Sequence, residues 1–178
     1  LQSFVFMPTF GLNNALVPII SYNYGAKNAK RVNHTIRLTI ITAVLIMLFG
    51  LAIFELVPGL LLSMFNASDN MMAIGKVALR IIASHFLFAG FNIISTSVFQ
   101  AIGNPIISLI ISLGRQLGIL LPAAFLLSLS GRVELVWLAF PIAEIFALTM
   151  CGINLIKTMK RANEIMATKP REREYSTL

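Results

Sequence analysis

The fold is decided by the stretch from Pro8 to Arg31, which reads PTFGLNNALVPIISYNYGAKNAKR. It begins as an apolar segment that carries two adjacent amides, Asn13 and Asn14, and a second proline, Pro18. It then continues without a linker into a basic turn. In a bilayer, each buried amide needs a hydrogen-bond partner, and each helix proline leaves a carbonyl that neighbouring groups must satisfy. We therefore expect this segment to face other helices or a wet cavity.

The composition around this stretch is that of a membrane protein. Of the 178 residues, 57% are hydrophobic and only 12% are charged, and the mean hydropathy is +0.85. Soluble domains carry about 25% charged residues. The apolar residues come in blocks that reach the roughly 20 residues of a membrane-spanning helix. The sequence therefore predicts an all-α integral membrane fold, with the lipid bilayer as its surroundings.

Five apolar blocks are long enough to cross a bilayer, and they lack the alternating pattern of strands. We expect helices over residues of about 1–24, 38–65, 77–102, 105–129 and 135–156, within a bundle that covers residues 1–158. The second block is longer than an upright helix needs, and Pro58 near its end predicts a break. Residues 159–178 are expected to be a basic tail, into which the last helix continues for a turn or two.

The distribution of lysine and arginine predicts the orientation. The loop after the first span and the tail share one side of a five-span bundle, and both are rich in basic residues. By the positive-inside rule that side is the cytoplasm, so we expect a multi-pass protein of the plasma or inner membrane with a cytoplasmic C-terminus. The tail either only fixes this topology, which is the simpler interpretation, or also contacts anionic lipid headgroups. The chain opens on Leu1 inside an apolar run, which indicates a piece of a longer protein.

Other classes of function find little support. The net charge of +7 lies in loops and the tail, so no basic face of a soluble domain is available for nucleic acid. The single Cys151 and the two histidines do not form a metal-ligand spacing. Phosphate loops and nucleophile motifs are also lacking. We expect neither an enzyme nor a metal site.

Two charged residues lie deep in the apolar blocks. Arg115 is ten residues into the fourth span, a depth of about 15 Å, where an arginine costs about 2.5–3.5 kcal/mol. Glu144 lies in the fifth span at a similar depth. Because consecutive antiparallel helices with a short loop are usually neighbours, we expect a buried ion pair. The pair either only joins the two helices, or lets Glu144 alternate between Arg115 and a proton or cationic substrate.

Polar residues in two further spans are candidates for lining a pathway. In the third span, His85, Asn92 and Thr96 belong to a polar stripe at helical spacing, which serves either helix packing or a cavity. In the first span, Asn14 and Ser21 are seven residues apart and share a face. With Arg115 and Glu144, these residues form the predicted substrate or ion pathway.

The spacing of the opening stretch, P-x2-G-x3-A-x2-P-x2-S-x3-GA followed by R, resembles the second helix of each half of the multidrug and toxic compound extrusion (MATE) transporters. The matching residues are Pro8, Gly11, Ala15, Pro18, Ser21, Gly25, Ala26 and Arg31. The run from Phe99 to Pro105 resembles the turn between the tenth and eleventh helices of that family. Arg115 with Pro122, and Pro141 with Glu144, are similar to its last two helices.

The resemblance implies five helices, eight to twelve, of a twelve-helix, two-bundle transporter. It implies part of a secondary-active antiporter that exports organic cations, drugs or metabolites in exchange for protons or sodium. Its partners would be a small-molecule substrate and the amino-terminal bundle of the same protein, and no cofactor beyond the coupling ion is expected. Some members carry an acidic sodium ligand in the tenth helix, whereas the span 77–102 contains no Asp or Glu. The coupling ion therefore stays open.

Two alternatives remain. One is a lipid-linked oligosaccharide flippase of the same superfamily, which would show more cationic residues facing its cavity. The other is a non-transporting membrane subunit. The sequence identifies neither the substrate nor the oligomeric state.

Overall fold

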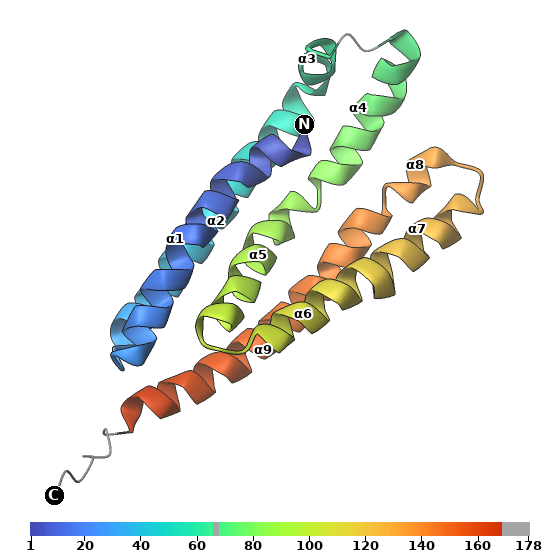
Figure 1. The fold of residues 1–178 in the computed structure, drawn as a ribbon. Coiled ribbons are helices and arrows are strands. Elements are labelled where there is room, and N and C mark those ends of the chain that lie inside the picture. Colours follow the sequence, from blue (N-terminus) through green and yellow to red (C-terminus); the bar gives the residue numbers. More distant parts are fainter. Residues whose placement is uncertain (66–67, 169–178) are drawn as a thin grey trace, which may run out of the picture.

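The computed structural model describes residues 1–65 and 68–168, and these residues form a bundle of helices (Figure 1). The elements in chain order are α1 (Gln2–Gly25), α2 (Ala29–Leu56), α3 (Pro58–Ser63), α4 (Asp69–Ala83), α5 (Phe86–Ala101), α6 (Pro105–Leu113), the π-helix η1 (Gly114–Leu120), α7 (Leu121–Ser128), α8 (Val133–Val136) and α9 (Ala139–Ala167). The predicted all-α membrane fold is confirmed.

Helix α5 is the centre of the bundle. Figure 1 shows it between the α1–α2 pair and the pair formed by α9 with the α6–η1–α7 span, and α5 contacts α1, α2, α6 and α9. Its side chains Ile94 and Val98 are fully buried in a cluster with Leu16 and Ile20 of α1 and Val32 of α2. The approach to α2 is close at Gly90, where an added Cβ would lie 3.0 Å from the carbonyl oxygen of Ala43.

The observed helices overlap the five predicted blocks, but their bounds differ: the second block is expected at 38–65, whereas α2 covers Ala29–Leu56, and the third block is divided between α4 and α5. Among residues 1–65 and 68–168, four helical stretches are long and apolar enough to cross a membrane, and α4 and α5, which meet at a 47° bend, make a fifth span if they are taken together. At the bend, the Ser84 hydroxyl donates to the carbonyl of Ile81, and the His85 ring bonds to the carbonyl of Ile82. Such side-chain bonds to nearby carbonyls compete with the helical hydrogen bonds. The break therefore needs neither proline nor glycine.

Turn chemistry explains the other interruptions. Helix α2 ends at Leu56, and Pro58 begins α3, because a proline cannot donate a hydrogen bond but suits a first helical turn. Between α5 and α6, Gly103 has a φ of 91°, a conformation that glycine adopts without strain. Both breaks follow the expectations from the sequence.

Helix α9 runs further than the apolar block that predicted it. It continues to Ala167, because Ala162 and Met166 are buried in the cluster of α1, α2 and α5. Polar bonds hold the same region: Lys27 donates to the carbonyl of Thr168 at 2.8 Å, and the amides of Asn33 and Asn163 are 3.1 Å apart. The predicted tail beyond residue 168 lies outside the described residues.

Candidate functional site

A cavity of about 160 Å³ lies where α1, α5, the α6–η1 span and α9 meet. Its lining combines aromatic and apolar side chains with a few polar groups: Phe6, Phe10, Asn92, Ile93, Thr96, Ile111, Ser112, Arg115, Glu144, Ala147 and Cys151. Four of the seven predicted pathway residues, Asn92, Thr96, Arg115 and Glu144, belong to it. Their assignment to a substrate or ion pathway stays a prediction.

The ion pair expected from the sequence is present. The Arg115 guanidinium donates through Nη1 to Oε1 of Glu144 at 3.0 Å. The two side chains differ in burial, because Glu144 is 6% exposed and Arg115 is 40% exposed. The carboxylate is therefore enclosed by protein, while the guanidinium also reaches the cavity.

A π-helix presents Arg115. The residue lies in η1 (Gly114–Leu120), which interrupts an otherwise α-helical span. Pro122, which follows in α7, lacks the N–H that would bond to the carbonyl of Gly118. Short π segments of this kind are frequent at functional sites.

Asn92 of α5 holds the other oxygen of the carboxylate. Its Nδ2 donates to Oε2 of Glu144 at 2.8 Å and to the Glu144 backbone carbonyl at 3.2 Å. Its Oδ1 is buried and has no hydrogen-bond partner among the described residues. Glu144 thus joins three spans, and an unused amide oxygen lies beside it.

Thr96 is another polar residue of the lining, and its hydroxyl donates to backbone carbonyls. The Thr96 hydroxyl donates to the carbonyls of Asn92 and Ile93 at 3.1 and 2.9 Å, so its oxygen can still accept or coordinate. Carboxylate, amide and hydroxyl oxygens suit a proton or a hard cation such as sodium rather than a metal that prefers sulfur ligands. Among residues 1–65 and 68–168, no group of three or more His, Cys, Asp and Glu could hold a metal ion.

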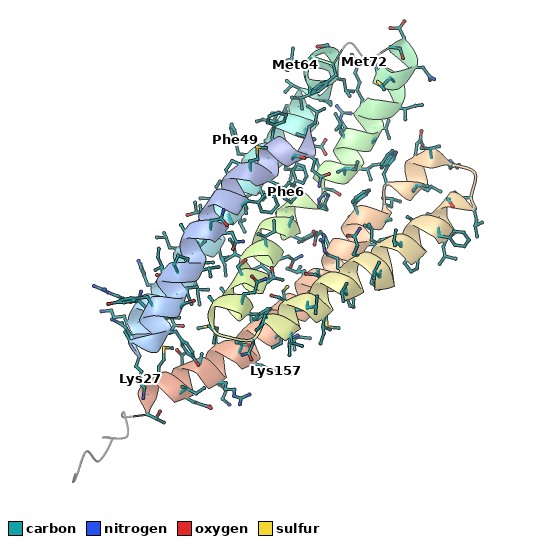
Figure 2. The ribbon with its side chains drawn as sticks, in the orientation of Figure 1. Phe6, Lys27, Phe49, Met64, Met72 and Lys157 are labelled. Atoms are coloured by element: carbon teal, nitrogen blue, oxygen red, sulfur yellow. The ribbon has the colours of Figure 1, made fainter. Side chains whose placement is uncertain are left out.

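His85 lies outside this cavity lining. It is 4% exposed, and its ring stacks on Phe6 and on Phe140 at centroid distances of 6.0 and 5.9 Å. Its Nε2 also lies 3.2 Å from the side-chain amide of Gln2. Figure 2 shows Phe6 on the side of α1 that faces the α4–α5 break. The structure therefore places His85 in an aromatic packing cluster beside the site.

The two candidates of the first span also lie outside the cavity lining. Asn14 is exposed on α1, and the Ser21 hydroxyl donates to the carbonyl of Ala101 at 3.0 Å, which joins α1 to the end of α5. The neighbouring Asn13 has a buried Oδ1 without a partner among the described residues. Of the two adjacent amides, Asn13 rather than Asn14 faces the protein interior.

The sequence did not single out the other seven lining residues: Phe6, Phe10, Ile93, Ile111, Ser112, Ala147 and Cys151. The phenylalanines and Ser112 are common residue types in membrane helices, and no local pattern separates those that line a cavity from those that face lipid. Cys151 is fully buried, with its Sγ 4.0 Å from the carbonyl of Asn92. Only the packing of α5 against α9 identifies it.

Comparisons with known proteins agree with this architecture. The family model described as MatE matches residues 1–126. The structure of the MATE multidrug transporter DinF-BH is 32% identical, with a TM-score of 0.81 over 88% of this chain and 35% of that one. An inward-facing multidrug resistance MATE family transporter of the MOP superfamily gives a TM-score of 0.83 at 20% identity, covering 91% of this chain and 38% of that one. The bent form of VcmN from Vibrio cholerae gives 0.81 at 19% identity, covering 92% and 38%.

The chain therefore spans little more than a third of the length of these solved structures. A search of curated protein sequences finds no significant match.

Proposed function

The chain belongs to the MatE family, and from that premise we propose that it is part of a secondary-active antiporter. The complete protein would export organic cations, drugs or metabolites in exchange for protons or sodium ions. DinF-BH, to which the chain is 32% identical, is described as a multidrug transporter, which supports this class of substrate.

The observation that carries the proposal is the placement of Glu144. A carboxylate inside a membrane-spanning helix is costly and marks an ion or substrate pathway by default. Glu144 is 6% exposed, yet it lines a cavity together with a half-exposed arginine. A carboxylate that only held two helices together would not need to border a cavity.

The arrangement suggests how Glu144 exchanges partners. When Arg115 occupies Oε1, the carboxylate is neutralised and unavailable to an ion. When a proton or sodium ion binds Glu144, the Arg115 side chain loses its partner and turns into the cavity, which it already reaches. A sodium ion would find Oδ1 of Asn92 as a second, unused oxygen ligand. Some MATE transporters carry an acidic sodium ligand in the tenth helix, and the corresponding span of this chain, 77–102, contains no Asp or Glu. Glu144 of α9 would supply the missing carboxylate beside Asn92.

The rest of the protein completes the pathway. The solved structures are more than twice as long as this chain, and five spans do not enclose a channel between two bundles. We infer that an amino-terminal bundle packs against this one, that the substrate passes between them, and that the basic end with the C-terminus faces the cytoplasm.

The flippase alternative is less well supported by the cavity. Among the residues that line it, Arg115 is the cation, and Glu144 already neutralises it. A site for a phosphate-linked sugar would keep such a cation available. We therefore retain the antiporter of cationic substrates.

The test is transport by the full-length gene in a host that lacks its own efflux pumps, with cationic dyes as substrates. We expect Glu144→Gln to abolish dye efflux at unchanged expression. Glu55→Gln is the matched control, because Glu55 also pairs with an arginine, Arg80, but at 3.6 Å and largely exposed. Normal efflux in Glu144→Gln would refute the role of this carboxylate, and no efflux by the parent protein would refute the proposed function.

A further inference from the structure

A second pocket lies at the end of the bundle where α1 and α5 end and α6 begins. It has a volume of about 180 Å³, and its polar lining consists of Tyr24, Asn104, Thr158 and Arg161. These residues come from the end of α1, the turn before α6, and the far part of α9. The pocket is therefore a junction of three separate parts of the chain.

Thr158 has an unused hydroxyl that faces this pocket. The residue is 7% exposed, and within the described part of the chain its hydroxyl forms no hydrogen bond. On the same helix, by contrast, the Thr149 hydroxyl donates to the carbonyl of Ile145 at 3.0 Å. The Thr158 oxygen is not among the enclosed polar atoms that lack a partner, so the hydroxyl is accessible from the pocket that it lines and can bond to a ligand there.

The charge of the pocket indicates what kind of ligand fits. Arg161 lies at its edge and makes no ion pair with any described residue, and none of the lining residues is acidic. Asn104 precedes Pro105, the first residue of α6, and its side chain does not cap that helix. The positive end of the α6 dipole is therefore close to the pocket, where Pro105 has no N–H and the Ile107 N–H donates to the Asn104 carbonyl at 3.2 Å. An anion with several acceptor oxygens would satisfy all of these groups.

The position of the pocket relative to the membrane-spanning part of the bundle indicates which anion it binds. Lys157 and Lys160 adjoin Thr158 and Arg161 on α9, and Figure 2 shows Lys27 and Lys157 towards the same end of the bundle. Most of the basic residues of the described chain lie at this end, directly beyond the apolar part of the spans. Phosphates of anionic lipids lie at this depth and attract such clusters.

We propose that this pocket binds the phosphate group of an anionic phospholipid. The Arg161 guanidinium and the Thr158 hydroxyl donate to the phosphate oxygens, while the acyl chains follow the apolar surface of the bundle. The bound phosphate would connect α9 to the ends of α1 and α5. It would therefore stabilise the helical extension of α9 beyond the membrane.

The experiment measures the thermal unfolding of the purified full-length protein in a neutral detergent. Phosphatidylglycerol is compared with diacylglycerol of the same acyl chains, which lacks only the headgroup phosphate and its glycerol. We expect phosphatidylglycerol, and not diacylglycerol, to raise Tm in a saturable way. The concentration for the half-maximal shift should rise about tenfold in Arg161→Gln, as for the loss of one charge-assisted hydrogen bond, and about threefold in Thr158→Val.

Lys160→Gln is the matched control, because it removes the same charge one residue away and outside the pocket. We expect it to shift the half-maximal concentration by less than twofold. Equal effects of Lys160→Gln and Arg161→Gln, or no effect of Thr158→Val, would overturn the proposal. Inorganic phosphate separates the two sources of the anion: if millimolar phosphate alone gives the full shift, the ligand is a soluble phosphate and the lipid assignment is wrong.

Discussion

Replacing either partner of the buried ion pair should destabilise the protein, but by different amounts. Arg115→Met leaves the Glu144 carboxylate, which is 6% exposed, with Asn92 as its remaining side-chain donor. Removing one partner of a fully buried pair costs about 3–5 kcal/mol. Because Arg115 is 40% exposed, we expect the lower end of this range.

Glu144→Gln is the milder change. Its side-chain oxygen can still accept the hydrogen bond from Asn92, and the unpaired Arg115 can turn into the cavity that it already borders. The loss is then that of one charge-assisted hydrogen bond, about 1.5 kcal/mol. The double variant Arg115→Met with Glu144→Gln should be more stable than Arg115→Met alone, since it no longer buries an unpaired charge.

The assay is thermal unfolding of the purified full-length protein in one detergent at one lipid content. We expect Tm to be highest for the parent protein and for Glu55→Gln, which should be equal. Glu144→Gln should follow, and the double variant should lie at or slightly below Glu144→Gln. Arg115→Met should have the lowest Tm. If Glu144→Gln were as unstable as Arg115→Met, or if the two effects simply added in the double variant, the reasoning from unequal burial would be wrong.

Two further predictions concern packing and capping, and both are measured by the same unfolding assay. Gly90→Val should lower the free energy of unfolding by about 2 kcal/mol through overpacking, because a Cβ at Gly90 would lie 3.0 Å from the Ala43 carbonyl oxygen. Gly152→Ala is the control. A Cβ at Gly152 meets nothing within 4 Å, so this change should be neutral or stabilising. Asn28→Ala should cost about 1 kcal/mol, because the Asn28 side chain accepts the N–H of Arg31 at 3.1 Å, whereas Asn28→Asp keeps that acceptor. A Gly90→Val protein as stable as Gly152→Ala would contradict the close approach of α2 and α5.

The sequence was informative where a residue conflicts with its surroundings. Arg115 and Glu144 are charges in apolar blocks, so depth alone predicts that they pair, and the structure contains that pair. Pro58 and Gly103 restrict or free the backbone, so the breaks beside them could be placed. These signals are local and strong.

The sequence was uninformative where the outcome depends on packing. The bend at His85 arises from side-chain bonds to the backbone that a serine and a histidine make only in some contexts. Asn13 and Asn14 look equivalent in sequence, and only the neighbouring helices decide which of them is buried. The hydropathy pattern locates the end of an apolar span near residue 156, whereas α9 ends at Ala167 because buried residues of its polar part continue the core.

The bend in the third span bears on how the chain enters the membrane during synthesis. Helix α5 has 16 residues, or about 24 Å at 1.5 Å each, which is short for a hydrocarbon layer of about 30 Å. The preceding α4 brings Lys76 and Arg80, which oppose partition from the translocon into lipid. The third span is therefore a weak insertion signal by itself. We expect it to leave the translocon together with the finished α1–α2 hairpin, whose surface already offers α5 its packing partners.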